Sequence, residues 1–185
     1  MGRDKALVRL AGRTLLERAV TTVREAGGTP LVLGPPRPGF GLEGVRFVDE
    51  TVDGEEGRGP LFALRHGLVE CATPLAVALA CDLPLVPPDL LRFLAAEAGG
   101  YAAVVPRALG EPQVLAAAYA SSCLEAIERR IAAGRFSVRG LLDEVNARLL
   151  GADELRPFGG EGIFLNINTP GDLAKAESIL KVRPA

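Results

Sequence analysis

The chain has 185 residues, of which 48% are apolar, and it carries a formal net charge of −2 at pH 7. This length and apolar content suffice for one domain with a substantial core, and the near-neutral charge gives no sign of a nucleic-acid-binding surface. No apolar run approaches the roughly 20 residues that span a bilayer, and the charged start from Arg3 onward is unlike a signal peptide. The three cysteines are odd in number and lack a Cys-x-x-Cys pair, which favours reduced thiols in a cytoplasm and argues against a structural zinc.

The first half of the chain predicts helices that alternate with short strands. Thr14, with Glu17 three residues later, has the pattern of a capping box ahead of an apolar stripe of helical period. A helix is also expected from Pro60 to Glu70, because proline favours the first turn and leucines follow at helical spacing. Short strands are expected at 31–33 and 45–48.

A wholly apolar run, Leu75–Cys81, lies between Pro74 and Pro84. Such a run predicts a strand buried on both faces of a parallel sheet, and the ligands of such sheets bind beyond the carboxyl ends of the strands. Asp82 stands at that end and needs a partner, because an unpaired buried charge is costly. Spacing alone leaves two roles open for Asp82: a cap of the turn before Pro84, or a ligand for a hard divalent cation such as Mg²⁺.

The second half continues the alternation. The expected elements are a helix at 89–98, strands at 101–105 and 113–119, a helix capped by Ser121 and Ser122, a short helix from Ser137 to Val145, and a strand at 163–165. Thr169-Pro170 predicts the start of a last helix, with Asp172 near its positive dipole end. Strands that alternate with helices indicate an α/β fold with a mostly parallel sheet covered on both faces.

The sequence lacks the residues that several common catalytic and nucleotide-binding sites require. His66 is the only histidine and is expected to be an ordinary helix residue, and neither a P-loop nor a dinucleotide-binding glycine motif occurs. What remains is a set of polar residues near strand ends: the Arg3-Asp4-Lys5 cluster, Asp49, Asp82, Asn166 and Asn168. Carboxylates, a lysine and amides at one edge of a sheet suit a phosphorylated ligand with a metal, which indicates a nucleotide or phosphosugar binder.

Four motifs, in this order, resemble those of the molybdenum cofactor guanylyltransferase family. They are Met-Gly-Arg-Asp-Lys-Ala at 1–6, Gly-Pro-Leu at 59–61, Cys-Asp-Leu-Pro at 81–84, and Phe-Leu-Asn-Ile-Asn-Thr-Pro at 164–170. The resemblance covers essentially residues 1–180. It departs from the family at Gly171, where glutamate is usual, and at Gly34-Pro35-Pro36, where the family usually carries an asparagine.

The resemblance implies one nucleotidyltransferase domain over 1–185, with a Rossmann-like three-layer fold, acting in the cytoplasm. It implies the transfer of GMP from GTP to molybdopterin cofactor with Mg²⁺, and with molybdoenzymes or other cofactor-biosynthesis proteins as partners. Lys5 and Asp82 would be catalytic, and Asp82 would hold the metal. The nucleotide-binding set would be Gly2, Lys5, Asp49 and Asp82, and the substrate-binding set Asn166 and Asn168.

The family signature continues ahead of the Met-Gly motif with Leu-Ala-Gly-Gly-x-Ser-x-Arg. The resemblance therefore implies that the chain lacks the first, central strand and the phosphate-cradling loop. Either a start codon was assigned too late, or the chain is a genuinely short protein that has lost catalysis. We expect a gap in the sheet that is filled by a rearranged segment, by a symmetry partner or by a shift of neighbouring strands, and we expect weak GTP binding. Other functions stay open: a related cytidylyl- or sugar-phosphate nucleotidyltransferase, or a non-catalytic nucleotide- or molybdopterin-binding module.

Overall fold

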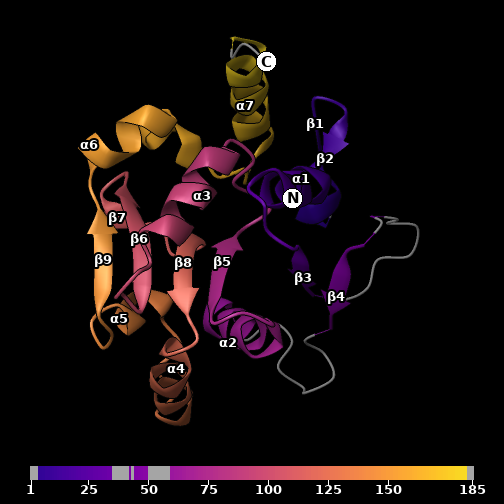
Figure 1. Cartoon of the computed structure of the whole chain (residues 1–185). Helices are drawn as coiled ribbons and strands as arrows, with labels where there is room; N and C mark the ends of the chain where they lie inside the picture. Colours follow the sequence, from indigo (N-terminus) through magenta and orange to yellow (C-terminus); the bar gives the residue numbers. More distant parts are fainter. Residues whose placement is uncertain (1–3, 35–41, 43, 50–58, 183–185) are drawn as a thin grey trace.

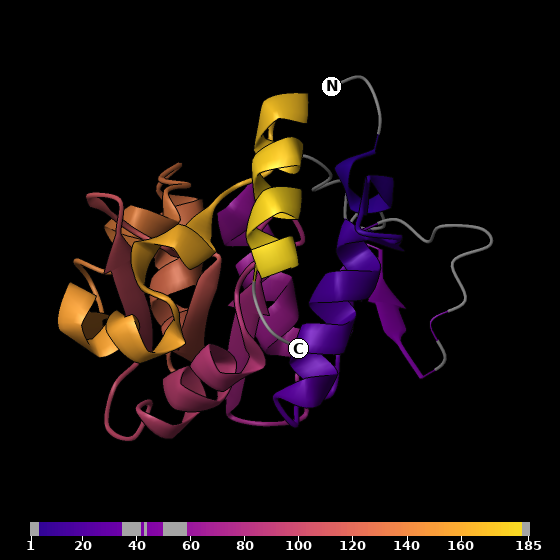
Figure 2. The same ribbon diagram turned by 90° about the horizontal axis from the view of Figure 1, so that it is seen from above.

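The structure, a computed structural model, describes residues 4–34, 42, 44–49 and 59–182. Helices lie on both faces of a central layer of strands, so the fold has three layers (Figure 1; Figure 2). This arrangement confirms the α/β class. Within the described ranges, no helix is long and apolar enough to cross a membrane.

The main sheet contains five strands. Its order is β5 (Leu75–Leu79), β8 (Ala116–Ala120), β6 (Ala103–Ala108) and β7 (Glu111–Pro112), with β9 (Ala147–Leu150) paired to β6. β8 runs antiparallel to both β5 and β6, whereas β6 and β9 are parallel. The prediction of a mostly parallel sheet is therefore wrong here. The connection from β6 to β8 spans only 109–115, which is shorter than the roughly dozen residues that a parallel crossover needs.

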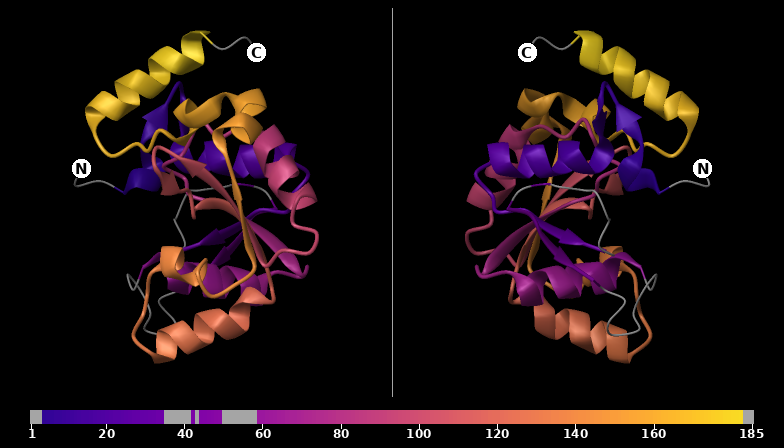
Figure 3. Two further views of the ribbon diagram at one scale, coloured as in Figure 1. Left: turned by 90° about the vertical axis from the view of Figure 1, so that its left-hand side faces the viewer. Right: turned by 90° about the vertical axis from the view of Figure 1, so that its right-hand side faces the viewer.

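Alternation along β6 and β8 supplies two cores, one on each face. Toward one face lie Val104, Ala116 and Ala118, which pack with leucines of α3 (Pro88–Ala96). Toward the other lie Ala103, Val105, Ala117 and Tyr119, which pack with α2 (Pro60–Glu70) and α4 (Cys123–Ala132). Figure 3 shows these helices on opposite sides of the strands. The two faces of one sheet thus hold the three layers together.

The first helix, α1 (Leu15–Glu25), has the predicted capping box. The Thr14 side chain accepts from the Glu17 N–H at 3.1 Å, and the Glu17 carboxylate accepts from the Thr14 N–H at 2.6 Å. Helix α2 has the predicted bounds, and α7 (Pro170–Val182) begins at the predicted proline. The other short elements are η1 (Lys5–Leu7), the hairpin of β1 (Arg9–Leu10) and β2 (Arg13–Thr14), α6 (Ala152–Leu155) and η2 (Arg156–Phe158).

Two predictions in the second half are wrong in their local structure. The helix expected from Ser137 to Val145 ends early, as α5 (Val138–Leu141); turns follow it, and β9 begins at Ala147. The strand expected at 163–165 is instead a 3₁₀ helix, η3 (Gly160–Phe164). Gly159 and Gly160 take positive φ angles of 109° and 64°, a conformation that glycine allows and that turns the chain from η2 into η3. The apolar residues of this segment are therefore buried as part of a 3₁₀ helix.

A second, separate sheet pairs β3 (Leu31–Leu33) with β4 (Arg46–Val48) in parallel. In Figure 1 β3 lies between β5 and β4, so its second edge is turned toward β5. Within the described residues no strand pairs with that edge of β3 or with the facing edge of β5. The expected gap is therefore present, and among the described residues no rearranged segment pairs with either edge. Filling by a second copy of the chain stays a prediction. Helix α1 packs on Val32 of β3 and on Leu85 beyond β5, which ties the two sheets together.

Strand β5 exposes backbone groups at this edge. The Ala80 N–H donates to Leu115 on the β8 side, and the Pro74 carbonyl accepts from Ser121 there. Because neighbouring residues of a strand point their backbone groups to opposite sides, the polar groups of the odd-numbered residues of β5 face away from β8. All five residues of β5 are half-buried, whereas β8 is buried from Ala116 to Tyr119. The strand predicted to be buried on both faces is thus the border of its sheet.

We expect amide hydrogen exchange to alternate along β5. The Ala76 and Ala78 amides donate within the sheet and should exchange slowly. The Val77 and Leu79 amides should exchange at least ~10-fold faster, because no ladder bond from the described residues protects them. Residue-resolved exchange by NMR measures this directly. Equal protection of all four amides would contradict the open edge and show that another segment covers β5.

Candidate active site

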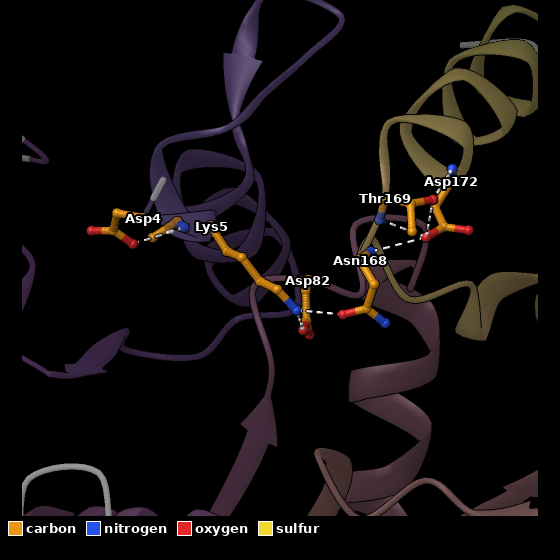
Figure 4. A network of polar contacts seen from close by, with 7 residues as sticks. Asp4, Lys5, Asp82, Asn168, Thr169 and Asp172 are labelled. Carbon is orange, nitrogen blue, oxygen red and sulfur yellow. Dashed lines mark hydrogen bonds and ion pairs between the residues drawn. The ribbon is translucent and has the colours of Figure 1, made fainter. Parts of the chain in front are cut away.

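Three distant segments of the chain meet at the Lys5 ammonium group (Figure 4). Lys5 Nζ lies 3.5 Å from Asp82 Oδ2 in an ion pair. It also donates a hydrogen bond to Asn168 Oδ1. The Lys5 and Asp82 side chains are 40% and 21% exposed, so the group is open to solvent and to a ligand on at least one side.

Lys5 is positioned by a short capped turn. It begins η1, and the Asp4 side chain accepts from the Ala6 N–H at 3.1 Å at the start of that turn. Ala6 is buried against Leu16 and Val20 of α1. The backbone of Lys5 is therefore anchored to the first helix, while its four-carbon side chain reaches outward.

Asp82 follows the end of β5 by three residues. The strand ends at Leu79, and a turn closed by the Leu83 N–H to the Ala80 carbonyl at 3.1 Å presents the Asp82 side chain. The Asp82 carbonyl accepts from the Ile167 N–H at 2.9 Å. Its backbone thus holds the carboxyl-terminal segment, and its carboxylate faces Lys5.

Asn168 is fixed from the other side by Asp172 at the start of α7. One oxygen of Asp172 accepts from the Asn168 N–H at 3.1 Å, the Thr169 N–H at 2.8 Å and the Thr169 hydroxyl at 2.9 Å. In return, the Asp172 N–H donates to the Thr169 hydroxyl at 3.2 Å. The hydrogen bonds from Thr169, followed by the one from the Asn168 N–H, lower the pKa of Asp172, so this carboxylate is ionised at neutral pH.

Thr169 and Asp172 were expected at the helix start but were not expected to take part in the site. The signal was present as a threonine with an aspartate three residues later, which is the spacing of a reciprocal cap. That spacing identifies the cap, whereas its location beside Lys5 depends on the fold.

The other predicted site residues lie outside this network. Asp49 directly follows β4 in the second sheet and is half-buried. Asn166 is exposed, two residues before Asn168. Gly2 falls outside the described residues, as do Pro35 and Pro36.

Asp82 and Asn168 offer oxygen ligands of the kind that Mg²⁺ prefers. Among the residues that the structure describes, no group of three His, Cys, Asp or Glu side chains could bind a metal ion alone. Mg²⁺ sites that hold nucleotides commonly combine one or two carboxylates with phosphate oxygens and water. The donor set therefore fits a cation that is shared with a phosphate ligand.

Comparison with known proteins gives consistent matches. Residues 1–149 match the family described as "MobA-like NTP transferase domain". The molybdenum cofactor guanylyltransferase of Rhodobacter capsulatus is 33% identical over 185 residues, which cover 98% of this chain and 90% of that protein. A probable molybdenum cofactor guanylyltransferase of Pelotomaculum thermopropionicum is 29% identical, covering 95% of this chain and 85% of that protein.

Solved structures agree with these matches. Molybdopterin-guanine dinucleotide biosynthesis protein A of Archaeoglobus fulgidus superposes with a TM-score of 0.80 at 27% identity, over 98% of this chain and 93% of that one. The 2-C-methyl-D-erythritol 4-phosphate cytidylyltransferase of Thermus thermophilus has a TM-score of 0.75 at 22% identity, over 96% and 94% of the two chains, and shares the fold. With a matching family model over most of its length and a 33% identical relative, this chain belongs to the molybdenum cofactor guanylyltransferase family of MobA-like nucleotidyltransferases.

Proposed function

We propose that this chain transfers GMP from GTP to molybdopterin cofactor, giving the guanine dinucleotide form of the cofactor. An oxygen of the cofactor's terminal phosphate forms a bond to the α-phosphorus of GTP. The bond from that phosphorus to the oxygen bridging the β-phosphorus breaks, and pyrophosphate leaves. The observation that carries this proposal is the convergence of Lys5, Asp82 and Asn168, from three segments of the chain, on one point.

Each of these residues has a role that its chemistry supports. The Lys5 ammonium would bind the triphosphate and offset negative charge on the departing pyrophosphate. The Asp82 carboxylate would hold Mg²⁺ against the phosphates, and the bound ion would neutralise charge there and help align the reacting groups. Asn168, fixed by Asp172, would orient the acceptor phosphate next to the α-phosphorus.

The remaining predicted residues have supporting roles in this proposal. Gly2 and Asp49 would contact GTP, and Asn166 would line the site near the transferred group. We take residues 1–185 as one nucleotidyltransferase domain that acts in the cytoplasm and passes its product to molybdoenzymes or to other cofactor-biosynthesis proteins.

The comparisons with known proteins favour guanylyl transfer over the alternative functions. Relatives that match across most of this chain are named as guanylyltransferases, whereas the cytidylyltransferase likeness at 22% identity supports the fold alone. An assay that offers GTP and CTP separately, each with molybdopterin cofactor, distinguishes the two activities. Cofactor binding without turnover of either nucleotide would instead indicate a non-catalytic module.

Asp82→Asn should lower Mg²⁺-dependent GMP transfer by roughly several hundredfold. The loss of one anionic metal ligand removes several kcal/mol of charge stabilisation, and each ~1.4 kcal/mol is a factor of ten in rate. Steady-state transfer of labelled GMP measures this change. Asp153→Asn, which alters an exposed aspartate of α6, is the matched control and should retain normal activity. Near-normal turnover of Asp82→Asn in saturating Mg²⁺ would return Asp82 to the role of a turn cap.

Lys5→Ala should weaken GTP binding about 10- to 100-fold, as expected for the loss of a charge-assisted contact to phosphate. The melting temperature should change little, because an exposed ion pair contributes little to stability. Calorimetric titration gives the affinity for GTP, and a thermal melt gives the melting temperature. Lys181→Ala, at the exposed end of α7, controls for the loss of a surface charge. Unchanged GTP affinity in Lys5→Ala would identify Lys5 as a solvated surface lysine.

A further inference from the structure

The ammonium of Lys5 contacts both oxygen donors that suit a cation. Lys5 Nζ is 3.5 Å from Asp82 Oδ2, and the same nitrogen donates to Asn168 Oδ1. In the part of the chain that the structure describes, the Asp82 side chain has Lys5 as its ion-pair partner, and no group of three His, Cys, Asp or Glu side chains could hold a metal ion. A carboxylate that is already paired with a unit positive charge attracts a second cation only weakly.

From this geometry we propose that Lys5 is the counter-ion of Asp82 in the nucleotide-free protein and hinders the binding of free divalent cations there. The cation would then bind only together with the nucleoside triphosphate. The inference rests on the proposed function, because it assigns Asp82 to the cation and Lys5 to the phosphates. It specifies the ligand class as a complex of a divalent cation with the triphosphate, bound as one unit.

The charges explain the dependence on nucleotide. Without phosphates, a cation at Asp82 would meet the like charge of Lys5 a few ångströms away, and this repulsion cancels part of the attraction of the single carboxylate. A triphosphate gives Lys5 another partner with more negative charge, and the departure of Lys5 frees the Asp82 and Asn168 oxygens. The backbone of Lys5 stays anchored by the Asp4 cap, so the exchange requires only a change in the flexible Lys5 side chain.

The test measures Mn²⁺ binding to the nucleotide-free protein by electron paramagnetic resonance of the free ion. Lys5→Met should bind Mn²⁺ at least about tenfold more tightly than the wild type, because it removes the competing charge and keeps the aliphatic stem. The double variant Lys5→Met/Asp82→Asn should lose this gain, and Lys181→Met should behave as the wild type does. In the presence of a non-hydrolysable GTP analogue, the wild-type protein should lower the signal of free Mn²⁺ below that of the analogue alone.

Two results would overturn the counter-ion role. One is Mn²⁺ binding to the nucleotide-free wild type that is as tight as binding to Lys5→Met. The other is a gain in Lys5→Met that persists when Asp82 is changed to asparagine. A thermal melt shows that each variant is folded, and Lys5→Gln replaces Lys5→Met if the latter is not. Absence of GMP transfer would contradict the proposed function without affecting these binding results, so failure of one proposal is distinguishable from failure of the other.

Discussion

The hydrogen bond from the Ile167 N–H to the Asp82 carbonyl, 2.9 Å long, is the contact on which the candidate site depends most. It joins two segments that lie more than eighty positions apart in the sequence. Ile167 is fully buried beside Leu10, Leu15 and Leu85, so the bond is held in place by a core cluster. Together with the Asp172 cap, it sets the position of Asn168 relative to Asp82.

The site needs this precision because the proposed transfer depends on the alignment of two phosphate groups and on the stabilisation of their charge, and it uses no nucleophilic side chain. Two reciprocal caps, at opposite ends of the chain, supply part of it. Thr14 with Glu17 begins α1, on which Lys5 is anchored, and Thr169 with Asp172 begins α7, next to Asn168. Ordinary helix-capping physics therefore positions two of the three residues at the site. The third, Asp82, is positioned by the turn after β5.

Local patterns in the sequence predicted the elements that local interactions determine. Helix α1 begins at its expected cap and α2 has its expected limits, because a cap, a first-turn proline and an apolar stripe are all local to the helix. The direction of β8 and the existence of β9 were missed, because both depend on pairing with β6. The apolar residues of the predicted strand at 163–165 suit either a strand or a helix, and the glycines before them favour a 3₁₀ helix.

The burial of Arg130 on α4 was also missed. This side chain is 5% exposed, is ion-paired with Glu144 and donates to the Gly140 carbonyl at 2.9 Å. Sequence spacing does not reveal these partners.

For the site, the sequence singled out Lys5, Asp82 and Asn168, but the convergence of these three side chains is a property of the fold.

A double-mutant cycle with Asp82→Asn and Asn168→Ala, read out as kcat/KM for GMP transfer, tests that convergence most directly. If the three residues act as one unit, the two changes should be strongly non-additive, with a coupling energy of about 1–3 kcal/mol. Additive effects, with a coupling near zero, would show that Asp82 and Asn168 act independently and would contradict a single shared site.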